Sequence, residues 1–277
     1  MSEKLLERIA INNFNYRRWS FDYFLESVKK LGLKNIELCG CHPHFTIFEA
    51  EEFPVEEFAA KIKDAGITVT AIEPEQNFLP VNIAAVNPYF REKSIEQLKF
   101  FIENAKVFDC DKVIIYPGKA FVDHPHSQGW KNARESVKTL CSIAKEHGVT
   151  LLMNPVSAFV SDLMMDSKTV KRMLDEVGAD NLGVSVNTSI LGYVGETLED
   201  YFELFGDKIQ MVQLADAVED CDQLAWGEGN VDLKAQIAVL EKYNYQGPVT
   251  MELLMEEYAE DPHKVHEDSL AYMKANM

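Results

Sequence analysis

A short motif recurs along the chain and constrains its fold more than any other feature. An amphipathic segment ends at a glycine and a short apolar run follows at once, as in KKLGLKNIEL, KEHGVTLLM and ELFGDKIQMVQL. Such a glycine is typical of the residue that follows a helix, because glycine adopts the left-handed conformation without steric penalty. The apolar run is typical of a buried parallel strand. The motif predicts helix-then-strand units at Gly32, Gly66, Gly148, Gly178 and Gly206.

Three further segments complete the set of strands. DCDKVIIYPG, residues 109–118, has a polar turn in place of the glycine, while RIAINN and YNYQGPVTMEL supply strands near the two ends of the chain. Strands are expected at residues 8–13, 34–39, 67–73, 112–116, 149–154, 182–187, 208–214 and 248–253. Helices are expected at residues 20–31, 54–65, 90–108, 128–147, 167–177, 197–205, 231–243 and 261–276.

Eight strand-then-helix units in 277 residues predict an α/β protein of the (β/α)8 TIM-barrel class, which usually takes about 250 residues. We expect a single domain over residues 1–277. A doubly wound open sheet is disfavoured, because the turn NNFNYRRWS after the first strand lacks the glycines of a phosphate-binding loop. Ser20 and Ser167 are expected to cap the first and fifth helices, and Pro54 and Pro262 to lie in first turns.

The charge balance excludes several classes of partner. The chain has 27 Lys and Arg against 45 Asp and Glu, so its formal net charge is −18. An acidic excess of this size repels nucleic acids and anionic membrane surfaces. No apolar run approaches the roughly 18–20 residues of a membrane helix, and the start MSEKLLERIAINNF does not have the pattern of a signal peptide. We expect a cytoplasmic protein with reduced cysteines, a small-molecule partner, and neither nucleic acid nor membrane as partner; a homo-oligomer is left open.

The expected strands end in polar residues. In a TIM barrel the active site lies at the carboxyl ends of the strands. Buried polar side chains there lose free energy unless they meet a ligand, water or one another. The pattern predicts a pocket of polyol size. Its candidate residues are Asn12, Asn13, residues 39–44, 73–77 and 116–118, Asn154, Asn187, residues 213–216 and Glu252.

The whole layout resembles the sugar isomerase and epimerase branch of the xylose isomerase-like TIM-barrel superfamily. The similarity is carried by NIELCGCHPHF, AIEPEQNFLPVN, the helix REKSIEQLKFFIENAKVF leading into KVIIYPG, the turn WGEGNVD, YQGPVTMEL and the closing MEEYAEDPHKVHEDSLAYM. Within the superfamily the chain is most similar in appearance to fructoselysine 3-epimerases. The endonuclease IV branch, with its DNA substrate and metal cluster, does not match the acidic composition.

The resemblance implies a metal site that this chain has largely lost. Members bind a divalent metal (Mn, Co, Mg or Zn) through a Glu, an Asp, a His and a Glu at the ends of strands five to eight. These positions are Asn154, Asn187, Gln213 and Glu252 here. Val160 and Ile190 likewise replace a Glu and a His that related epimerases carry nearby. Each lost carboxylate removes a charge at bonding distance from the metal, a loss of several kcal/mol. We therefore expect no bound cofactor at the inherited position.

We assign catalytic roles to Glu252 and Asn154, because the family chemistry is proton transfer next to a sugar carbonyl. The residues expected to bind substrate are His44, Glu73, Glu75, Asn187, Gln213 and Asp216. Two other metal sites are left open. One is the C-x-C-H-x-H segment of Cys39, Cys41, His42 and His44, and the other is a displaced site built from Glu73, Glu75, His44, Glu252, His124 and His126.

Two functions follow from these residues. The first is a sugar or sugar-phosphate isomerase or epimerase that acts on a ketose or aldose derivative at the barrel mouth. The alternative is a catalytically inactive pseudoenzyme that binds a sugar or regulates a relative. Retention of Glu252 favours the first, and neutralisation of three ligand positions favours the second.

Overall fold

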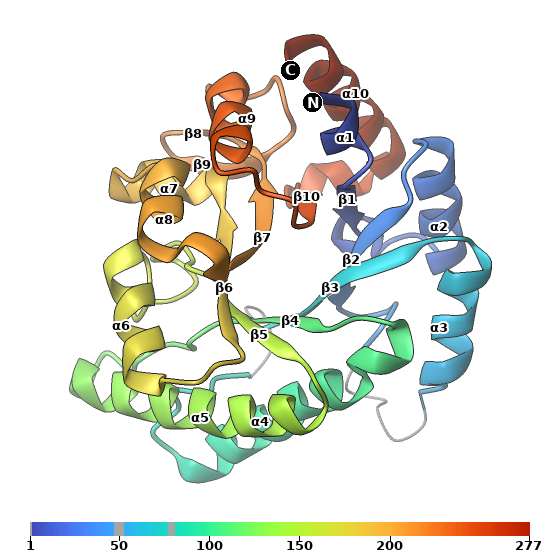
Figure 1. Cartoon of the computed structure of the whole chain (residues 1–277). Coiled ribbons are helices and arrows are strands. Elements are labelled where there is room, and N and C mark those ends of the chain that lie inside the picture. Colours follow the sequence, from blue (N-terminus) through green and yellow to red (C-terminus); the bar gives the residue numbers. More distant parts are fainter. Residues whose placement is uncertain (1, 47–52, 77–80) are drawn as a thin grey trace.

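The computed structural model of the chain describes residues 2–46, 53–76 and 81–277. Eight parallel strands close into a barrel, and helices surround it (Figure 1), so the predicted (β/α)8 TIM barrel is confirmed. Around the barrel the strands follow the order β1, β10, β7, β6, β5, β4, β3, β2. Read in the other direction from β1, this is the order of the chain, with β10 closing the barrel against β1. Asn77, a candidate from the third strand end, lies outside the described residues, as do residues 78–80 of the same motif.

Every predicted strand lies within two residues of an observed one. The barrel strands are β1 (Ile9–Asn12), β2 (Asn35–Gly40), β3 (Thr68–Pro74), β4 (Lys112–Ile115), β5 (Thr150–Met153), β6 (Leu182–Asn187), β7 (Ile209–Leu214) and β10 (Val249–Met251). A two-stranded antiparallel hairpin, β8 (Asp216–Val218) and β9 (Cys221–Leu224), follows β7 and was not predicted.

The helices are α1 (Ser2–Leu6), α2 (Phe21–Lys30), α3 (Val55–Asp64), α4 (Pro88–Asn104), α5 (His126–Glu146), α6 (Ser167–Val177), α7 (Leu191–Val194), α8 (Leu198–Phe205), α9 (Leu233–Lys242) and α10 (Pro262–Asn276). They agree with the predicted ranges within two residues, except that α4 ends four residues before the predicted end and a 3-10 helix, Ala105–Phe108, follows it. The short α1 and α7 were not predicted. No helix among the described residues is long and apolar enough to cross a membrane.

Turn chemistry explains why the helices end where they do. Gly32, Gly66, Gly148, Gly178 and Gly206 all have positive φ, between 51° and 74°, as the motif predicts. At the one unit without a glycine, Asp109 takes the left-handed conformation with φ 54°. Short polar residues tolerate this conformation better than other non-glycine residues do.

The helix starts confirm part of the predicted capping. Ser20 caps α2, and Pro262 lies in the first turn of α10. Ser167 was wrongly assigned as a cap: Asp166 caps α6 with a capping box, and Ser167 is the first residue of the helix. Pro54 was also misplaced by one position, because it is the cap residue of α3 itself.

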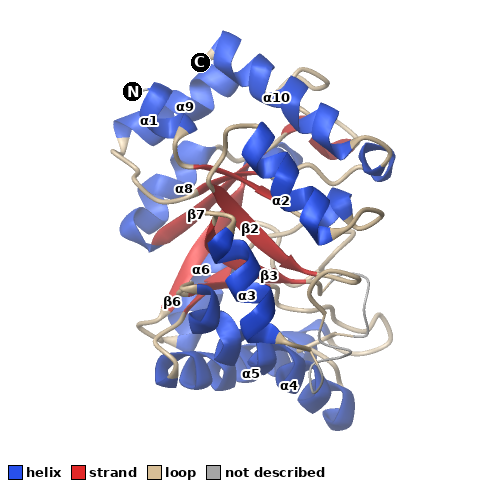
Figure 2. Ribbon diagram, turned by 90° about the vertical axis from the view of Figure 1, so that its right-hand side faces the viewer, coloured by secondary structure: helices blue, strands red, loops and turns tan. Residues whose placement is uncertain are grey.

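The barrel separates two apolar regions. One large core includes Ile36 and Leu38 of β2, and Figure 2 shows the helices placed on the outside of the strands. A small cluster lies inside the barrel, made of Ala71, Ile114, Tyr116, Leu152, Val156 and Met211. This interior cluster draws on β3, β4, β5, β7 and the segments after β4 and β5, and β1, β2, β6 and β10 contribute nothing to it. The rest of the interior is therefore available to polar side chains.

Candidate functional site

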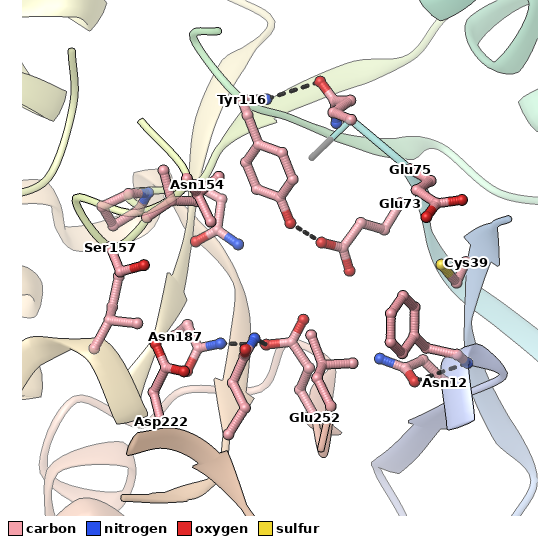
Figure 3. Close-up of a pocket in the computed structure, with 18 of the residues that line it drawn as sticks. Asn12, Cys39, Glu73, Glu75, Tyr116, Asn154, Ser157, Asn187, Asp222 and Glu252 are labelled. Atoms are coloured by element: carbon pink, nitrogen blue, oxygen red, sulfur yellow. Dashed lines mark hydrogen bonds between the residues drawn. The ribbon is translucent and has the colours of Figure 1, made fainter. Parts of the chain in front are cut away.

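A cavity of about 250 Å³ opens at the carboxyl ends of the strands. Its wall carries polar side chains from around the barrel, among them Asn12, Glu73, Tyr116, Asn154, Asn187 and Glu252 (Figure 3). Apolar side chains of Phe14, Val156, Phe159 and Leu254 complete it. The cavity lies where the sequence predicted a polyol-sized pocket, and its size and mixed lining suit a small polar ligand.

Three of the four positions that correspond to the family's metal ligands, Asn154, Asn187 and Glu252, line this cavity, and the fourth, Gln213, contacts two of them. Asn154 Nδ2 donates to Gln213 Oε1 at 2.8 Å, and Gln213 Nε2 donates to Glu252 Oε1 at 3.2 Å. The side-chain amide of Asn187 donates to the other oxygen of Glu252 (Figure 3), and so does Gln223 Nε2 of β9 at 3.1 Å. Three amide N–H groups are therefore directed at the one carboxylate retained from the family set.

Three buried glutamates gather around Gln213. We call Glu37 of β2, Glu73 of β3 and Glu252 after β10 the acid cluster. Gln213 Nε2 lies 3.0 Å from Glu37 Oε1, 3.3 Å from Glu73 Oε2 and 3.2 Å from Glu252 Oε1. One oxygen from each of the three lies within 4.8 Å of the others. A single amide group thus serves three carboxyl groups in the barrel interior.

Burial shapes the protonation of the acid cluster. Burial and then the negative charges of Glu252 and Glu37 raise the pKa of Glu73 well above its ordinary value, while its hydrogen bond from Gln213 acts in the opposite direction. The pKa of Glu252 is also raised, first by burial and then by the charge of Glu37. Carboxyl groups with raised pKa values in a cavity are suited to general acid–base catalysis.

Tyr116 extends the acid cluster toward the mouth. Its hydroxyl donates to Glu73 Oε1, and Figure 3 shows the ring pointing from the end of β4 toward that carboxyl group. Gln76 fixes the backbone, because its Oε1 accepts a hydrogen bond from Tyr116 N at 3.0 Å. Tyr116 was among the strand-end candidates, but the sequence gave no reason to assign it a role.

Glu37 was missed altogether by the sequence reasoning. A signal was present: Glu37 stands between Ile36 and Leu38, whose side chains pack on the helices. Alternation along a strand then directs Glu37 into the barrel. Gln223 was missed for another reason, since it lies on the unpredicted hairpin.

Three predicted substrate-binding residues, His44, Gln213 and Asp216, are absent from the residues that line the cavity, and Gln213 contacts the acid cluster instead. His44 is buried, with Nδ1 3.2 Å from Asn13 Nδ2 and Nε2 2.8 Å from the carbonyl oxygen of Trp19. Burial lowers the pKa of His44. Asp216 accepts hydrogen bonds from four backbone N–H groups of its own loop. The side chains of His44 and Asp216 are engaged in holding the protein's own loops.

Glu75 does lie on the cavity wall, with Arg17 Nη1 3.8 Å from its Oε1. Burial raises the pKa of Glu75, and the charge of Arg17 opposes this. The two proposed alternative metal sites are not assembled: within the described ranges, the acid cluster is the group of three ligand side chains close enough to share a metal ion. His124 and His126 are instead paired locally, with Asp123 and with the carbonyl oxygen of Asp162.

Comparison with known proteins agrees with this fold. Residues 25–276 match the profile of the family described as xylose isomerase-like TIM barrel. Fructoselysine 3-epimerase of Shigella flexneri is 22% identical over 240 residues, which cover 86% of this chain and 87% of that protein. A structure of L-ribulose 3-epimerase superposes with a TM-score of 0.82 at 18% identity, covering 97% of this chain and 94% of that one. The IOLI protein, whose structure holds a zinc atom, gives 0.77 at 17% identity, covering 98% and 99%.

Proposed function

We propose, from the premise that this chain belongs to the xylose isomerase-like TIM barrel family, that it binds a ketose or aldose derivative at the barrel mouth and moves a proton next to its carbonyl group. The observation that supports this most is the pair of carboxyl groups with raised pKa values, Glu73 and Glu252, on one cavity wall beside Tyr116. A small carbohydrate is thus the proposed partner, and the cytoplasm the proposed location.

The inherited metal position does not fit a divalent cation. The N–H groups of Asn187 and Gln213 point at Glu252, so the cavity presents donors where a cation needs oxygen or nitrogen lone pairs. Asn154, the third neutral amide of the inherited position, donates to Gln213. The metal would supply polarisation of the carbonyl oxygen in relatives that hold one. No step proposed for this chain passes through it.

The proton transfer is instead assigned to the chain's own groups. Glu252 in its ionised form removes the proton from the carbon beside the carbonyl, and the raised pKa makes it a stronger base. The electron pair moves to the carbonyl oxygen, and Tyr116 with protonated Glu73 donates hydrogen bonds to the charge that develops there. The proton returns to a carbon of the resulting enediolate. Asn154 and Asn187 are placed to bind sugar hydroxyl groups.

A second function is favoured by the same three amides. Asn154, Asn187 and Gln213 bond to one another or to Glu252, and this hydrogen-bonded set matches sugar hydroxyl groups as both donor and acceptor. A protein that binds a sugar in this cavity without catalysing its reaction would be a regulatory or sugar-binding pseudoenzyme.

Solvent exchange separates the two functions. Chelator-treated protein is incubated in heavy water with fructoselysine, L-ribulose or D-fructose, and NMR follows replacement of the hydrogen next to the carbonyl by deuterium. We expect exchange with at least one sugar, its abolition by Glu252→Gln, and a smaller loss in Tyr116→Phe. Ser157→Ala, which alters the cavity wall away from the acid cluster, is the matched control.

Binding of a sugar without any exchange would support the pseudoenzyme instead. The triple reversion Asn154→Glu, Asn187→Asp and Gln213→His then rebuilds the family's ligand set, and we expect it to gain divalent metal. Exchange that persists unchanged in Glu252→Gln would refute the proposed proton transfer.

A further inference from the structure

A second cavity, of about 520 Å³, opens beside the proposed sugar site. It lies between the segments that follow β3, β4 and β5, and its wall includes Asn82, Lys119 and Ser161. The two cavities share four wall residues, which are Gln76, Tyr116, Phe159 and Val160. They are therefore adjoining compartments, and a ligand held in the first can extend into the second.

The two cavities differ in charge. Among the described residues, the wall of the first carries four carboxyl groups and no Lys, Arg or His. The four are Glu73, Glu75, Asp222 and Glu252, which Figure 3 shows around the cavity. Within the same part of the chain, the wall of the second carries a single charged side chain, Lys119. An anionic group of a ligand would lie beside carboxyl groups in the first cavity, whereas the second offers it a positive charge.

Side-chain hydrogen bonds hold the backbone around Lys119 in place. Asn82 Oδ1 accepts from Lys119 N at 3.0 Å, and Asn82 Nδ2 donates to the carbonyl oxygen of Lys119 at 2.9 Å. Ser161 Oγ donates to the carbonyl oxygen of Gly118 at 2.5 Å. Gly118 has φ 79°, and a Cβ there would lie 2.3 Å from Asn82 Oδ1, so this close approach requires glycine. The position of Lys119 on the cavity wall is thus fixed before a ligand binds.

The ammonium group of Lys119 can bind a further partner. Its Nζ donates to the carbonyl oxygen of Phe159 at 2.5 Å, which uses one of the three hydrogen bonds that an ammonium group can donate. Of the ion pairs between described residues, with N–O distances up to 4.0 Å, none includes Lys119. Its positive charge and two of its donors are therefore available to a ligand.

Phe159 connects the two cavities. Its ring lines both of them and the residue is 81% exposed, while Lys119 Nζ lies 5.8 Å from the ring centroid. A ligand that runs from the first cavity to Lys119 would cover this ring and remove apolar surface from water. Such a contact favours a ligand with carbon atoms between its sugar and its anionic group.

We propose that the second cavity binds an anionic group, a carboxylate or a phosphate, of a sugar derivative whose carbonyl end lies in the first cavity. Lys119 donates charge-assisted hydrogen bonds to that group, and Phe159 packs against the part of the ligand between the two ends. The place of the sugar rests on the proposed function. What is added is the class of substrate, an acidic sugar derivative, and its orientation, with the carbonyl end toward Glu252.

The experiment is a calorimetric titration of the full-length, chelator-treated protein with two pairs of ligands. D-fructose 6-phosphate is compared with D-fructose. Fructose joined at C1 to the nitrogen of 6-aminohexanoate is compared with the carboxamide of the same compound, which lacks the charge at the far end. We expect the anionic member of at least one pair to bind at least about fivefold more tightly than its neutral partner. The pair that shows this preference identifies the anion.

Lys119→Met removes the charge while keeping the length of the side chain. We expect it to abolish the preference for the anionic member and to leave the affinity for the neutral member within about twofold. A merely structural role of Lys119 would lower both affinities alike. Lys119→Arg keeps the charge and should keep the preference. Lys131→Met is the matched control, because Lys131 is an exposed lysine of α5 that lines neither cavity.

Three results would overturn the subsite. They are equal affinities within both pairs, an anion preference that survives in a folded Lys119→Met protein verified by circular dichroism, and failure of all four compounds to bind at about 10 mM. Where Lys119→Met does not fold, Lys119→Gln takes its place with the same expectation. The solvent-exchange assay separates this proposal from the proposed function. Exchange without anion preference refutes the subsite alone, whereas Lys119-dependent binding without exchange refutes the proton transfer alone.

Discussion

Asp216 offers a sharp test of how the loop after β7 is held in place. Its Oδ1 accepts from Ala217 N at 3.0 Å and Val231 N at 2.9 Å, and its Oδ2 from Gly227 N at 3.0 Å and Gly229 N at 2.8 Å. The residue itself is 2% exposed. The sequence suggested a substrate-binding role for Asp216, whereas these bonds indicate that it anchors the chain around the β8–β9 hairpin.

Asp216→Asn should destabilise the protein without changing the shape of the side chain. An asparagine has one acceptor oxygen, so two of the four backbone donors lose their partner and face an NH2 group. Each unpaired buried donor costs about 1–3 kcal/mol. Because this loop is only partly buried, the lower part of the summed range applies, and we expect a loss of about 2–4 kcal/mol. That is a large share of the about 5–15 kcal/mol by which proteins are usually stable.

The assay is urea unfolding followed by far-ultraviolet circular dichroism, with the free energy of unfolding extrapolated to water. Asp232→Asn is the matched control, because Asp232 caps α9 through one bond to Ala235 N and asparagine caps a helix equally well. We expect the control to change stability by less than about 0.5 kcal/mol. A loss below about 1 kcal/mol in Asp216→Asn would refute the anchoring role.

Three further predictions concern buried groups, all measured as the free energy of unfolding in urea. Tyr116→Phe should cost about 1.5–3 kcal/mol while Glu73 is ionised, and less as pH falls through the raised pKa of Glu73, since protonation removes the charged acceptor; a loss that does not change with pH would contradict this. Burial lowers the pKa of His266 to about 4 from 6.5, so the unfolded chain takes up the proton first, and stability should fall by about 1.4 kcal/mol per unit from pH 6.5 down to 4. His266→Leu should flatten that slope, and an unchanged slope would contradict the assignment of this pH dependence to His266. Gly40→Ala should cost about 1–3 kcal/mol, because the added Cβ would lie 2.4 Å from the ring of Phe101 in α4. Gly192→Ala is the control, because a Cβ added there meets nothing within 4 Å.

The architecture could be predicted because its signals are local. The glycine after each helix and the apolar run after the glycine are set by neighbours in sequence, and five such glycines have positive φ in the structure. The elements that escaped prediction lack these signals: the β8–β9 hairpin has the acidic pair Glu219 and Asp220 at its turn, and α7 has only four residues. The cap of α6 was placed one residue too late. Asp166 rather than Ser167 caps this helix, and its side chain accepts a hydrogen bond from Thr169 N, three residues further on.

The location of the cavity could also be predicted, but the contacts between the side chains around it could not. Glu73, Asn154, Asn187 and Glu252 line the cavity as the strand ends suggested. Glu37, by contrast, enters the acid cluster only because β2 lies beside β1 and β3, with a register shift between Ile36 and Glu37. His44 and Asp216 were assigned to the ligand because a sequence shows a polar residue near a strand end without showing which backbone group it meets.

The sequence by itself determined the barrel, the order of its strands and the neutral amides at three of the family's ligand positions. Those are properties of residue type and spacing along the chain. Only the tertiary structure decided that Gln213 of β7 meets carboxyl groups from β2, β3 and the end of β10. The physical reason is that strand closure brings together side chains separated by 176, 140 and 39 positions, and their mutual distances and burial set their charge.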